Sequence, residues 1–380
     1  MVELGTLITQ AKTVRCGESN YPVLSMTMHD GLVLQDDRFK KAIASKDKSD
    51  YKVVYRDQLV ISFPIDEGVL ATQRITDAGI VSPAYGIWDV DQEKVVPEFL
   101  EYALRCKRSI AYYKAKLRGS TARRRSLPTP TLLAHTVPLP SIEEQKYVLD
   151  LIHKVETIIH LRKDELKELD ALTKARFVEM FGTYPANEMG WCTGTIRDVI
   201  SEARYGSSRP AVEGGQYPYL RMNNITYDGE LDLSDIKRID VPESELEKCT
   251  VRQGDVLFNR TNSKELVGKT CVYNRDEMMV LAGFVIRIRV NSRVLPVFLS
   301  SFMNTDFSKQ MLLGMCRTAV GQANINAKEL QDIGLYIPPI DLQQKFIDFK
   351  LQIDKSKLLG ARQARFIAKT RPTNIILSIG

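Results

Sequence analysis

The feature that most constrains the fold is a long stretch, residues 141–181, that contains neither Gly nor Pro. Its apolar residues are spaced by four and three positions, which predicts a helix that packs along a second helix. Pro140 and Ser141 favour a helix start, and Gly182 and Pro185 favour its end. The seam consists of Val148, Ile152, Val155, Ile159, Leu166 and Leu169, and Arg162 interrupts it.

The opening of this helix occurs twice. Pro-Pro-Ile-Asp-Leu-Gln-Gln-Lys-Phe at 338–346 repeats Pro-Ser-Ile-Glu-Glu-Gln-Lys-Tyr at 140–147, with an expected offset of 199 residues. Residues 217–222, 254–259 and 296–299 likewise echo 21–26, 57–62 and 97–100, at offsets of 196, 197 and 199. The sequence therefore predicts two copies of one unit, each a globular part followed by a helix.

Each globular part is expected to be mixed α and β. In the first copy, short apolar runs bounded by turn residues predict strands at 21–26, 58–63 and 85–88. Pro97 then opens a helical pattern, and proline is tolerated in the first helical turn. Residues 185–336 repeat this order.

Bulk composition excludes few classes of protein. A net charge of +6 and a pI near 8.8 fit a nucleic-acid partner, but also many cytosolic proteins. The chain has no basic-then-apolar leader and no apolar run near 18 residues, so we expect a cytoplasmic protein that does not span a membrane. Its six cysteines contain no Cys-x-x-Cys pair, which predicts reduced thiols without zinc or disulfides.

No convincing catalytic constellation is present. Residues 263–270 resemble a phosphate-binding loop but carry Ser263 where the first glycine is needed. The sequence lacks Gly-x-Gly-x-x-Gly and the Asn-Pro-Pro-aromatic or Asp-Pro-Pro-aromatic motifs of adenine methyltransferases, and its four histidines are scattered. We therefore expect a chain that binds rather than reacts, with no catalytic residue, no bound metal and no cofactor of its own.

Apolar and turn positions recur between the copies, whereas the polar residues between them differ, which predicts two surfaces that recognise different targets. Arg can pair with guanine, and Asn or Gln with adenine. The DNA-binding candidates are Arg118, Ser120, Thr121, Arg123, Arg124 and Arg125 in the first copy, and Arg221, Asn223, Asn224, Arg260, Asn262, Lys264, Arg317, Thr318, Gln322 and Asn324 in the second. Solvated loop tips are the alternative interpretation.

Together these motifs resemble the DNA-specificity subunits of type I restriction–modification systems. The resemblance rests on the repeated order of globular part and helix, on the two Pro-x-Ile openings, and on Gly-Asp-Val-Leu-Phe at 254–258. It implies two α/β target recognition domains and two long helices paired as an antiparallel coiled coil. The implied segments are domains at 1–140 and 183–338, helices at 141–182 and 339–370, and an irregular tail at 371–380.

The resemblance also implies partners. Such subunits bind double-stranded DNA, dock two methyltransferase subunits and recruit restriction–translocation subunits, so S-adenosylmethionine, ATP and Mg would belong to those partners. The candidate helix and partner contacts are the seam of the first helix together with Phe346, Phe349 and Ile353 of the second.

Two departures from the pattern of these specificity subunits leave alternative interpretations open. The first copy lacks a counterpart of the Gly190-Trp191 pair, and the helical pattern weakens after Leu359. A truncated, inactive specificity subunit is therefore one alternative. A coiled-coil scaffold that binds only protein is another, and a fused restriction–methylation enzyme is disfavoured by the missing methyltransferase motifs.

Overall fold

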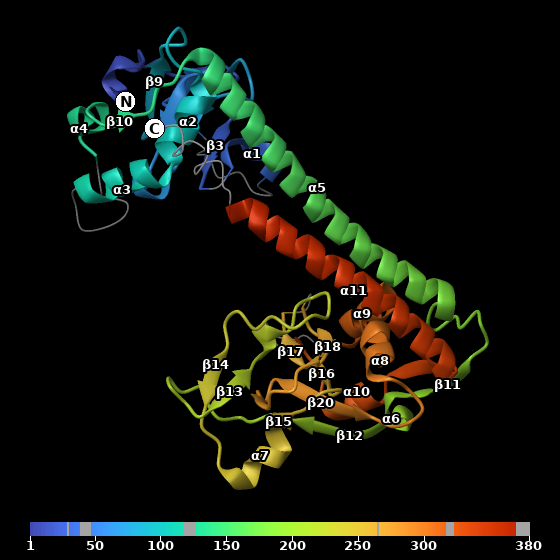
Figure 1. Cartoon of the computed structure of the whole chain (residues 1–380). Helices are drawn as coiled ribbons and strands as arrows, with labels where there is room; N and C mark the ends of the chain where they lie inside the picture. The colour runs from blue at the N-terminus through green and yellow to red at the C-terminus, as the bar shows by residue number, and fades with distance from the viewer. Residues whose placement is uncertain (29, 39–46, 118–126, 264–265, 317–322, 370–380) are drawn as a thin grey trace. The chain divides into compact units, whose positions relative to one another are not determined.

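The computed structural model describes residues 1–28, 30–38, 47–117, 127–263, 266–316 and 323–369. The chain forms two compact units, residues 1–163 with 361–380 and residues 164–360. They are called unit 1 and unit 2 here, and Figure 1 labels their elements.

Unit 1 is built on a four-stranded antiparallel sheet in the order β2-β9-β6-β7. Its strands are β1 (Val2–Glu3), β2 (Ile8–Gln10), β3 (Leu24–Thr27), β4 (Gly31–Leu34), β5 (Lys52–Tyr55), β6 (Leu59–Ile61), β7 (Leu70–Thr72), β8 (Ala78–Val81), β9 (Gly86–Val90) and β10 (Thr136–Val137). Its shorter helices are η1 (Leu4–Thr6), α1 (Gln35–Arg38), η2 (Ile65–Glu67), α2 (Pro97–Arg105), α3 (Lys107–Lys116) and α4 (Thr129–Leu133).

Unit 2 has the corresponding sheet in the order β12-β20-β16-β18. Its strands are β11 (Cys192–Thr195), β12 (Ile200–Tyr205), β13 (Tyr217–Leu220), β14 (Lys237–Ile239), β15 (Thr250–Val251), β16 (Val256–Asn259), β17 (Thr261–Asn262), β18 (Thr270–Val272), β19 (Met279–Leu281), β20 (Val285–Val290), β21 (Ala323–Asn324) and β22 (Gly334–Ile337). Its shorter helices are α6 (Ile196–Val199), η4 (Met222–Asn224), α7 (Glu243–Cys249), α8 (Pro296–Met303), α9 (Asp306–Met315) and α10 (Ala327–Gln331).

The strand registers agree with the predicted duplication. Leu59 pairs with Trp88 in unit 1, as Val256 pairs with Ile288 in unit 2. The helices after the sheet also correspond, because α2 and α8 both begin at a proline and are followed by α3 and α9. The two units therefore share the topology of this four-stranded sheet and the two helices that follow it.

The expected offset of 199 at the helix openings is wrong by one residue. Gln145 accepts from the backbone N–H of Val96 at 2.8 Å and donates to Pro140 O, while Gln343 accepts from Leu295 N–H at 2.8 Å and donates to Pro338 O. The structural equivalents are therefore Gln145 and Gln343, 198 residues apart. The sequence left this ambiguous because Gln343 is followed by a second glutamine.

Two long helices complete the fold, α5 (Ile142–Phe181, 40 residues) and α11 (Ile340–Lys369, 30 residues). Figure 1 labels both helices. Within unit 2, contacts that lie earlier in α5 are made to residues later in α11. Phe177 contacts Phe346, with ring centroids 5.2 Å apart, and Asp170 pairs with Lys357 at 2.6 Å. The helices therefore pack antiparallel, and the predicted fold class is confirmed. The helix α11 continues through Gly360.

Several residues of the predicted helix seam belong to the globular cores. Val148 and Ile152 are buried in the core of unit 1. Phe346 is fully buried in unit 2 against Phe177, whose ring in turn stacks on Phe298 of α8. These three side chains hold helix and globular part together within each unit. The others, Val155, Ile159, Leu166, Leu169, Phe349 and Ile353, are partly exposed, and their contact with another protein stays a prediction.

Candidate nucleic-acid interface

Many predicted DNA contacts lie outside the described residues and stay predictions. These are Arg118, Ser120, Thr121, Arg123, Arg124, Arg125, Lys264, Arg317, Thr318 and Gln322. The described candidates, all in unit 2, are Arg221, Asn223, Asn224, Arg260, Asn262 and Asn324.

A short two-stranded ribbon brings two of the predicted loops together. Strands β17 and β21 pair antiparallel, with Thr261 opposite Asn324 and Asn262 opposite Ala323. The Thr261 hydroxyl also donates to Asn324 Oδ1 at 2.9 Å. Asn262 and Asn324, more than sixty residues apart in the sequence, therefore lie on neighbouring strands of one element.

Arg260, directly before the ribbon, is held by its backbone and by an aromatic ring. Its N–H donates to Phe284 O at 3.0 Å and its carbonyl accepts from Ile325 N at 2.9 Å. Its guanidinium carbon lies 4.8 Å from the centroid of the Tyr205 ring. Stacking on a ring limits the orientations of the guanidinium plane, which favours directional pairing with an acceptor such as guanine.

The aromatic side chains around Arg260 were missed by sequence reasoning. Phe284 is 55% exposed in the turn before β20, and Tyr205 is 41% exposed at the end of β12. An aromatic residue in or next to a strand is usually a core residue, so the sequence carried no signal that these two face solvent.

The side chains of the turn at residues 221–224 mostly bond within the protein. Arg221 pairs with the Asp235 carboxylate at 2.9 Å, and Asn224 is buried, with its amide donating to Asp232 O and accepting from Arg221 N. These two side chains hold the turn in place. Asn223 is exposed and is the member of this group best placed to contact a ligand.

Lys269 joins this turn to the segment before the ribbon. Its ammonium donates to Met222 O at 2.9 Å, and its backbone carbonyl accepts from Asn259 N at 2.8 Å. Burial lowers the pKa of Lys269. Asn223 and Arg260 thus belong to one continuous region, and Lys269 is a further cation there that sequence reasoning did not single out.

The corresponding position in unit 1 is apolar. Phe63 occupies the place of Arg260 at the predicted offset of 197, and its ring packs edge-on against Tyr85 with centroids 5.9 Å apart. Phe63 is 44% exposed. One scaffold position therefore presents a cation in unit 2 and a hydrophobic ring in unit 1.

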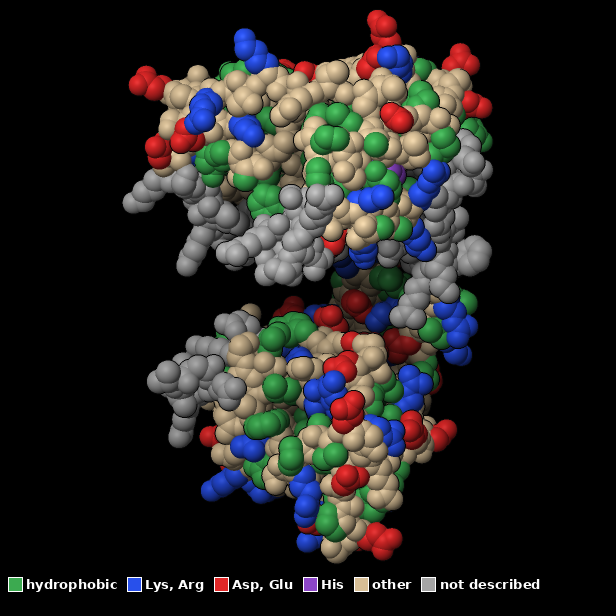
Figure 2. Space-filling view, turned by 90° about the vertical axis from the view of Figure 1, so that its left-hand side faces the viewer, with side chains coloured by type: hydrophobic (Ala, Val, Ile, Leu, Met, Phe, Trp, Pro, Cys, Tyr) green, Lys and Arg blue, Asp and Glu red, His purple; other side chains and the backbone are tan. Residues whose placement is uncertain are grey.

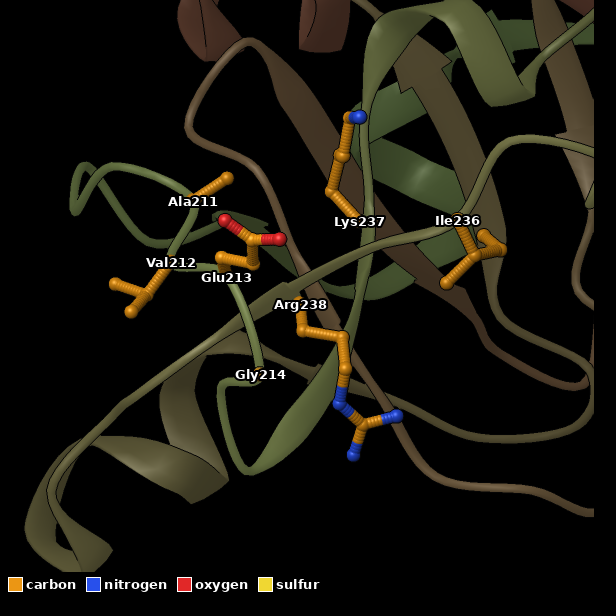
Figure 3. Close-up of a pocket in the computed structure, with 7 residues that line it drawn as sticks. All are labelled: Ala211, Val212, Glu213, Gly214, Ile236, Lys237 and Arg238. Atoms are coloured by element: carbon orange, nitrogen blue, oxygen red, sulfur yellow. The ribbon is translucent and has the colours of Figure 1, made fainter.

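A separate hollow of about 500 Å³ lies at the edge of unit 2, lined by residues 211–214 and 236–238. It contains one carboxylate, Glu213, and the consecutive Lys237 and Arg238, whose side chains extend in opposite directions (Figure 3). The Arg238 guanidinium donates to Gln216 O at 2.6 Å, so it anchors the neighbouring loop.

Charge over the described surface is mixed. On the face shown in Figure 2, Lys and Arg side chains are interspersed with Asp and Glu. Across the described ranges, no group of His, Cys, Asp or Glu has a geometry suited to a metal, and no helix is both long and apolar enough to cross a bilayer. The face shown in Figure 2 therefore has no broad patch of a single charge among its described residues.

Comparison with known proteins finds a family model that matches part of the chain. Residues 189–363 match the family described as the type I restriction modification DNA specificity domain. This match covers less than half of the chain, and it confirms the resemblance inferred from the repeated motifs.

The individual relatives are distant. The chain is 22% identical over 227 residues to the EcoKI specificity subunit of Escherichia coli strain K12, an alignment that covers 56% of this chain and 49% of the relative. It is 24% identical over 174 residues to the putative MjaX specificity subunit of Methanocaldococcus jannaschii, covering 45% and 40%. The chain thus spans about half the length of the curated relatives it matches.

A solved structure shares the fold. A chain from work on complex assembly and conformational transition of the type I restriction–modification system superposes with a TM-score of 0.63 at 18% identity. The superposition covers 100% of this chain and 96% of that one.

Proposed function

We propose that the chain is a DNA-specificity subunit of a type I restriction–modification system, in which each globular unit reads one part of a split, asymmetric sequence. The observation that carries the proposal is the contrast between Arg260 and Phe63, which occupy one position of a repeated sheet. Equivalent scaffolds with different chemistry at the same position suit a subunit with two unlike half-targets.

In unit 2 the proposed reading element is the ribbon β17–β21 with Arg260. The DNA major groove admits a two-stranded β-ribbon, and Arg and Asn side chains pair with guanine and adenine there. Arg260, Asn262 and Asn324 supply these groups at one place. In this proposal Arg260 reads guanine, and the two asparagines supply amides for adenine.

Unit 1 would use a different mode of contact. An exposed aromatic ring such as Phe63 can pack on a thymine methyl group or wedge between base steps. The predicted basic segment at 118–125 would supply phosphate and guanine contacts.

The helices would set the gap between the half-targets. A 40-residue helix such as α5 is about 60 Å long at 1.5 Å per residue. A helix pair is stiff, so its length would fix the number of unread base pairs. The exposed Leu172 on α5, and Leu351 and Leu358 on α11, provide apolar surface for methyltransferase subunits.

In this proposal the chain is not itself an enzyme. The docked methyltransferase subunits would supply S-adenosylmethionine chemistry, and restriction subunits would supply the ATP- and Mg-dependent steps. This division agrees with relatives that are named specificity subunits.

Selection from random DNA tests the proposal. The chain, co-purified with a cognate methyltransferase subunit, would be used to enrich binders from random-sequence duplexes. We expect a motif of two short halves around a fixed unread gap. Enrichment of no motif by an intact complex would contradict the proposal, and would favour a scaffold that binds only protein.

A further inference from the structure

Two lysines of unit 2, the buried Lys269 and the partly buried Lys309, have no carboxylate partner within 4 Å among the described residues. Lys269 is 8% exposed and donates to Met222 O, and the Lys309 ammonium donates to Gly268 O at 3.1 Å. Within the described part of the chain, neither ammonium lies in an ion pair of 4 Å or less. Burying a cation against carbonyl oxygens alone is costly, so the arrangement favours an added anion.

Lys309 lies at the edge of this pair, next to solvent. Its ammonium is 5.0 Å from the centroid of the Tyr227 ring, and Tyr227 is 43% exposed. Lys309 is in the first turns of α9, which packs closely on Gly268: a Cβ at that glycine would come within 2.5 Å of Leu312 Cδ1. Both the helix and the loop that hold the ammonium are therefore fixed.

Of the charges that act on Lys309, those of Lys174 and Lys269 are positive and that of Asp228 is negative. Burial, Lys174 and Lys269 lower the pKa of Lys309 to about 8, and Asp228 opposes them. The one described ion pair of Lys174 is to Asp306, at 3.6 Å. Lys269 also faces the buried Cys271 thiol, whose pKa burial raises, so that thiol stays neutral.

The site is continuous with the proposed reading surface. Asn259 N–H donates to the carbonyl of Lys269, and Gly268 N–H donates to the carbonyl of Asn259. Asn259 is the residue before Arg260. An anion bound at Lys309 would therefore lie close to the ribbon that, in the proposed function, enters the groove.

We propose that Lys309, assisted by the charge of Lys269, binds a phosphate of the DNA backbone beside the β17–β21 ribbon. The inference rests on the proposed function and deepens it, because phosphate contacts fix the register of a protein on a duplex while other groups read the bases. Lys309 makes the contact, and Lys269 adds a second positive charge behind it.

The test compares variants in binding to a mixed-sequence DNA duplex between about 50 and 200 mM KCl, where each phosphate contact contributes about 0.9 to the salt slope. We expect Lys309→Met to reduce the slope by about one and to weaken binding about tenfold at low salt. Lys309→Arg should keep both the salt slope and the low-salt affinity of wild type. The matched control is Lys350→Met, because Lys350 is similarly covered but pairs with Asp354 at 2.9 Å on α11.

A pH series adds a readout that a purely structural lysine would not give. Phosphate binds the protonated amine, so wild-type affinity should fall as pH rises through about 8, the pKa of Lys309 in the free protein. Lys309→Arg stays charged and should lack this fall. Competitive amine labelling followed by peptide mass spectrometry should show DNA protecting Lys309 but not Lys350.

The outcomes separate the two proposals. If wild type binds DNA and folded Lys309→Met binds with the same slope, pH profile and labelling, the phosphate site is wrong and the specificity function stands. If wild type fails to bind DNA even at low salt with its methyltransferase partner present, the proposed function fails, and the phosphate site fails with it.

Discussion

Gln343 Oε1 accepts a hydrogen bond from the backbone N–H of Leu295 at 2.8 Å, which ties the first turn of α11 to the residue before α8. The same amide donates to Arg293 O and Pro338 O. Gln145 makes the equivalent bonds to Val96, Lys94 and Pro140 in unit 1. A fully buried glutamine is thus the joint between globular part and long helix in both units.

Replacing Gln343 with Leu should destabilise unit 2. The change leaves a buried N–H and two carbonyls unpaired, and each such loss costs about 1–3 kcal/mol. Trp191 lies in unit 2 and Trp88 in unit 1, so Trp191 fluorescence in a Trp88→Phe background reports the urea unfolding of unit 2.

Gln344→Ala is the control for this prediction, because Gln344 is exposed and bonds only to Asp348 among the described contacts. We expect it to leave the unfolding midpoint of unit 2 within error. Equal effects of the two substitutions would show that the Gln343 joint does not support the fold.

Acid should weaken unit 1 through His135. Burial, with a smaller contribution from Arg108, lowers the pKa of His135 to about 4, and the ring bonds to Ser109 Oγ at 2.8 Å. Below about pH 6.5, His135 binds a proton in the unfolded chain but stays neutral in the folded chain until the pH approaches 4. The free energy of unfolding should therefore fall between pH 6.5 and 4, by up to about 3 kcal/mol.

Unfolding of unit 1, followed by Trp88 fluorescence in a Trp191→Phe background, checks the pH dependence. In His135→Gln the free energy of unfolding should fall less between pH 6.5 and 4 than in wild type, even though the substitution lowers stability near neutral pH. His160→Gln, at an exposed position of α5, should keep the wild-type dependence of stability on pH. If His135→Gln keeps the wild-type pH dependence of unfolding, that dependence does not come from His135.

A buried ion pair should dominate the stability of the unit 2 sheet. Arg287 on β20 is 2% exposed and pairs with Glu202 on β12. Burial alone would raise the pKa of Glu202, but the hydrogen bond and charge of Arg287 outweigh it and lower that pKa. Glu202→Leu would leave a buried cation without its carboxylate, at a cost of about 3–5 kcal/mol.

The double variant Glu202→Leu with Arg287→Met separates lost pairing from lost packing. Apolar replacement of both partners of a buried pair is often close to neutral. We expect the double variant to unfold in urea at a higher midpoint than Glu202→Leu alone. A double variant less stable than the single one would contradict this account.

Much of the fold could be predicted from sequence because its signals are periodic and repeated. The absence of Gly and Pro from 141–181 identified the helix α5, and the echo of 57–62 in 254–259 identified a strand in each unit. The buried glutamine that joins α11 to the globular part was harder to predict, because Gln343 and Gln344 are both plausible matches for Gln145. Only burial distinguishes them.

The candidate interface was predicted in part. Polar residues after strands identified Arg260 and Asn262, and the structure pairs their segment with Asn324. Tyr205 and Lys309 were missed, because their roles depend on which side chains from distant segments they meet. Asn224 shows the converse: its amide looked suited to a base but instead holds a turn.

Sequencing DNA methylation tests the central claim most directly. A host would express this chain with its neighbouring methyltransferase subunit, either as wild type, as Arg260→Ala with Asn262→Ala, or as Arg118→Ala. The account predicts a methylated motif in two halves with a fixed gap, of which Arg260→Ala with Asn262→Ala relaxes one half and Arg118→Ala relaxes the other. An active complex whose motif has a single half, or whose motif is unchanged in both variants, would contradict the account.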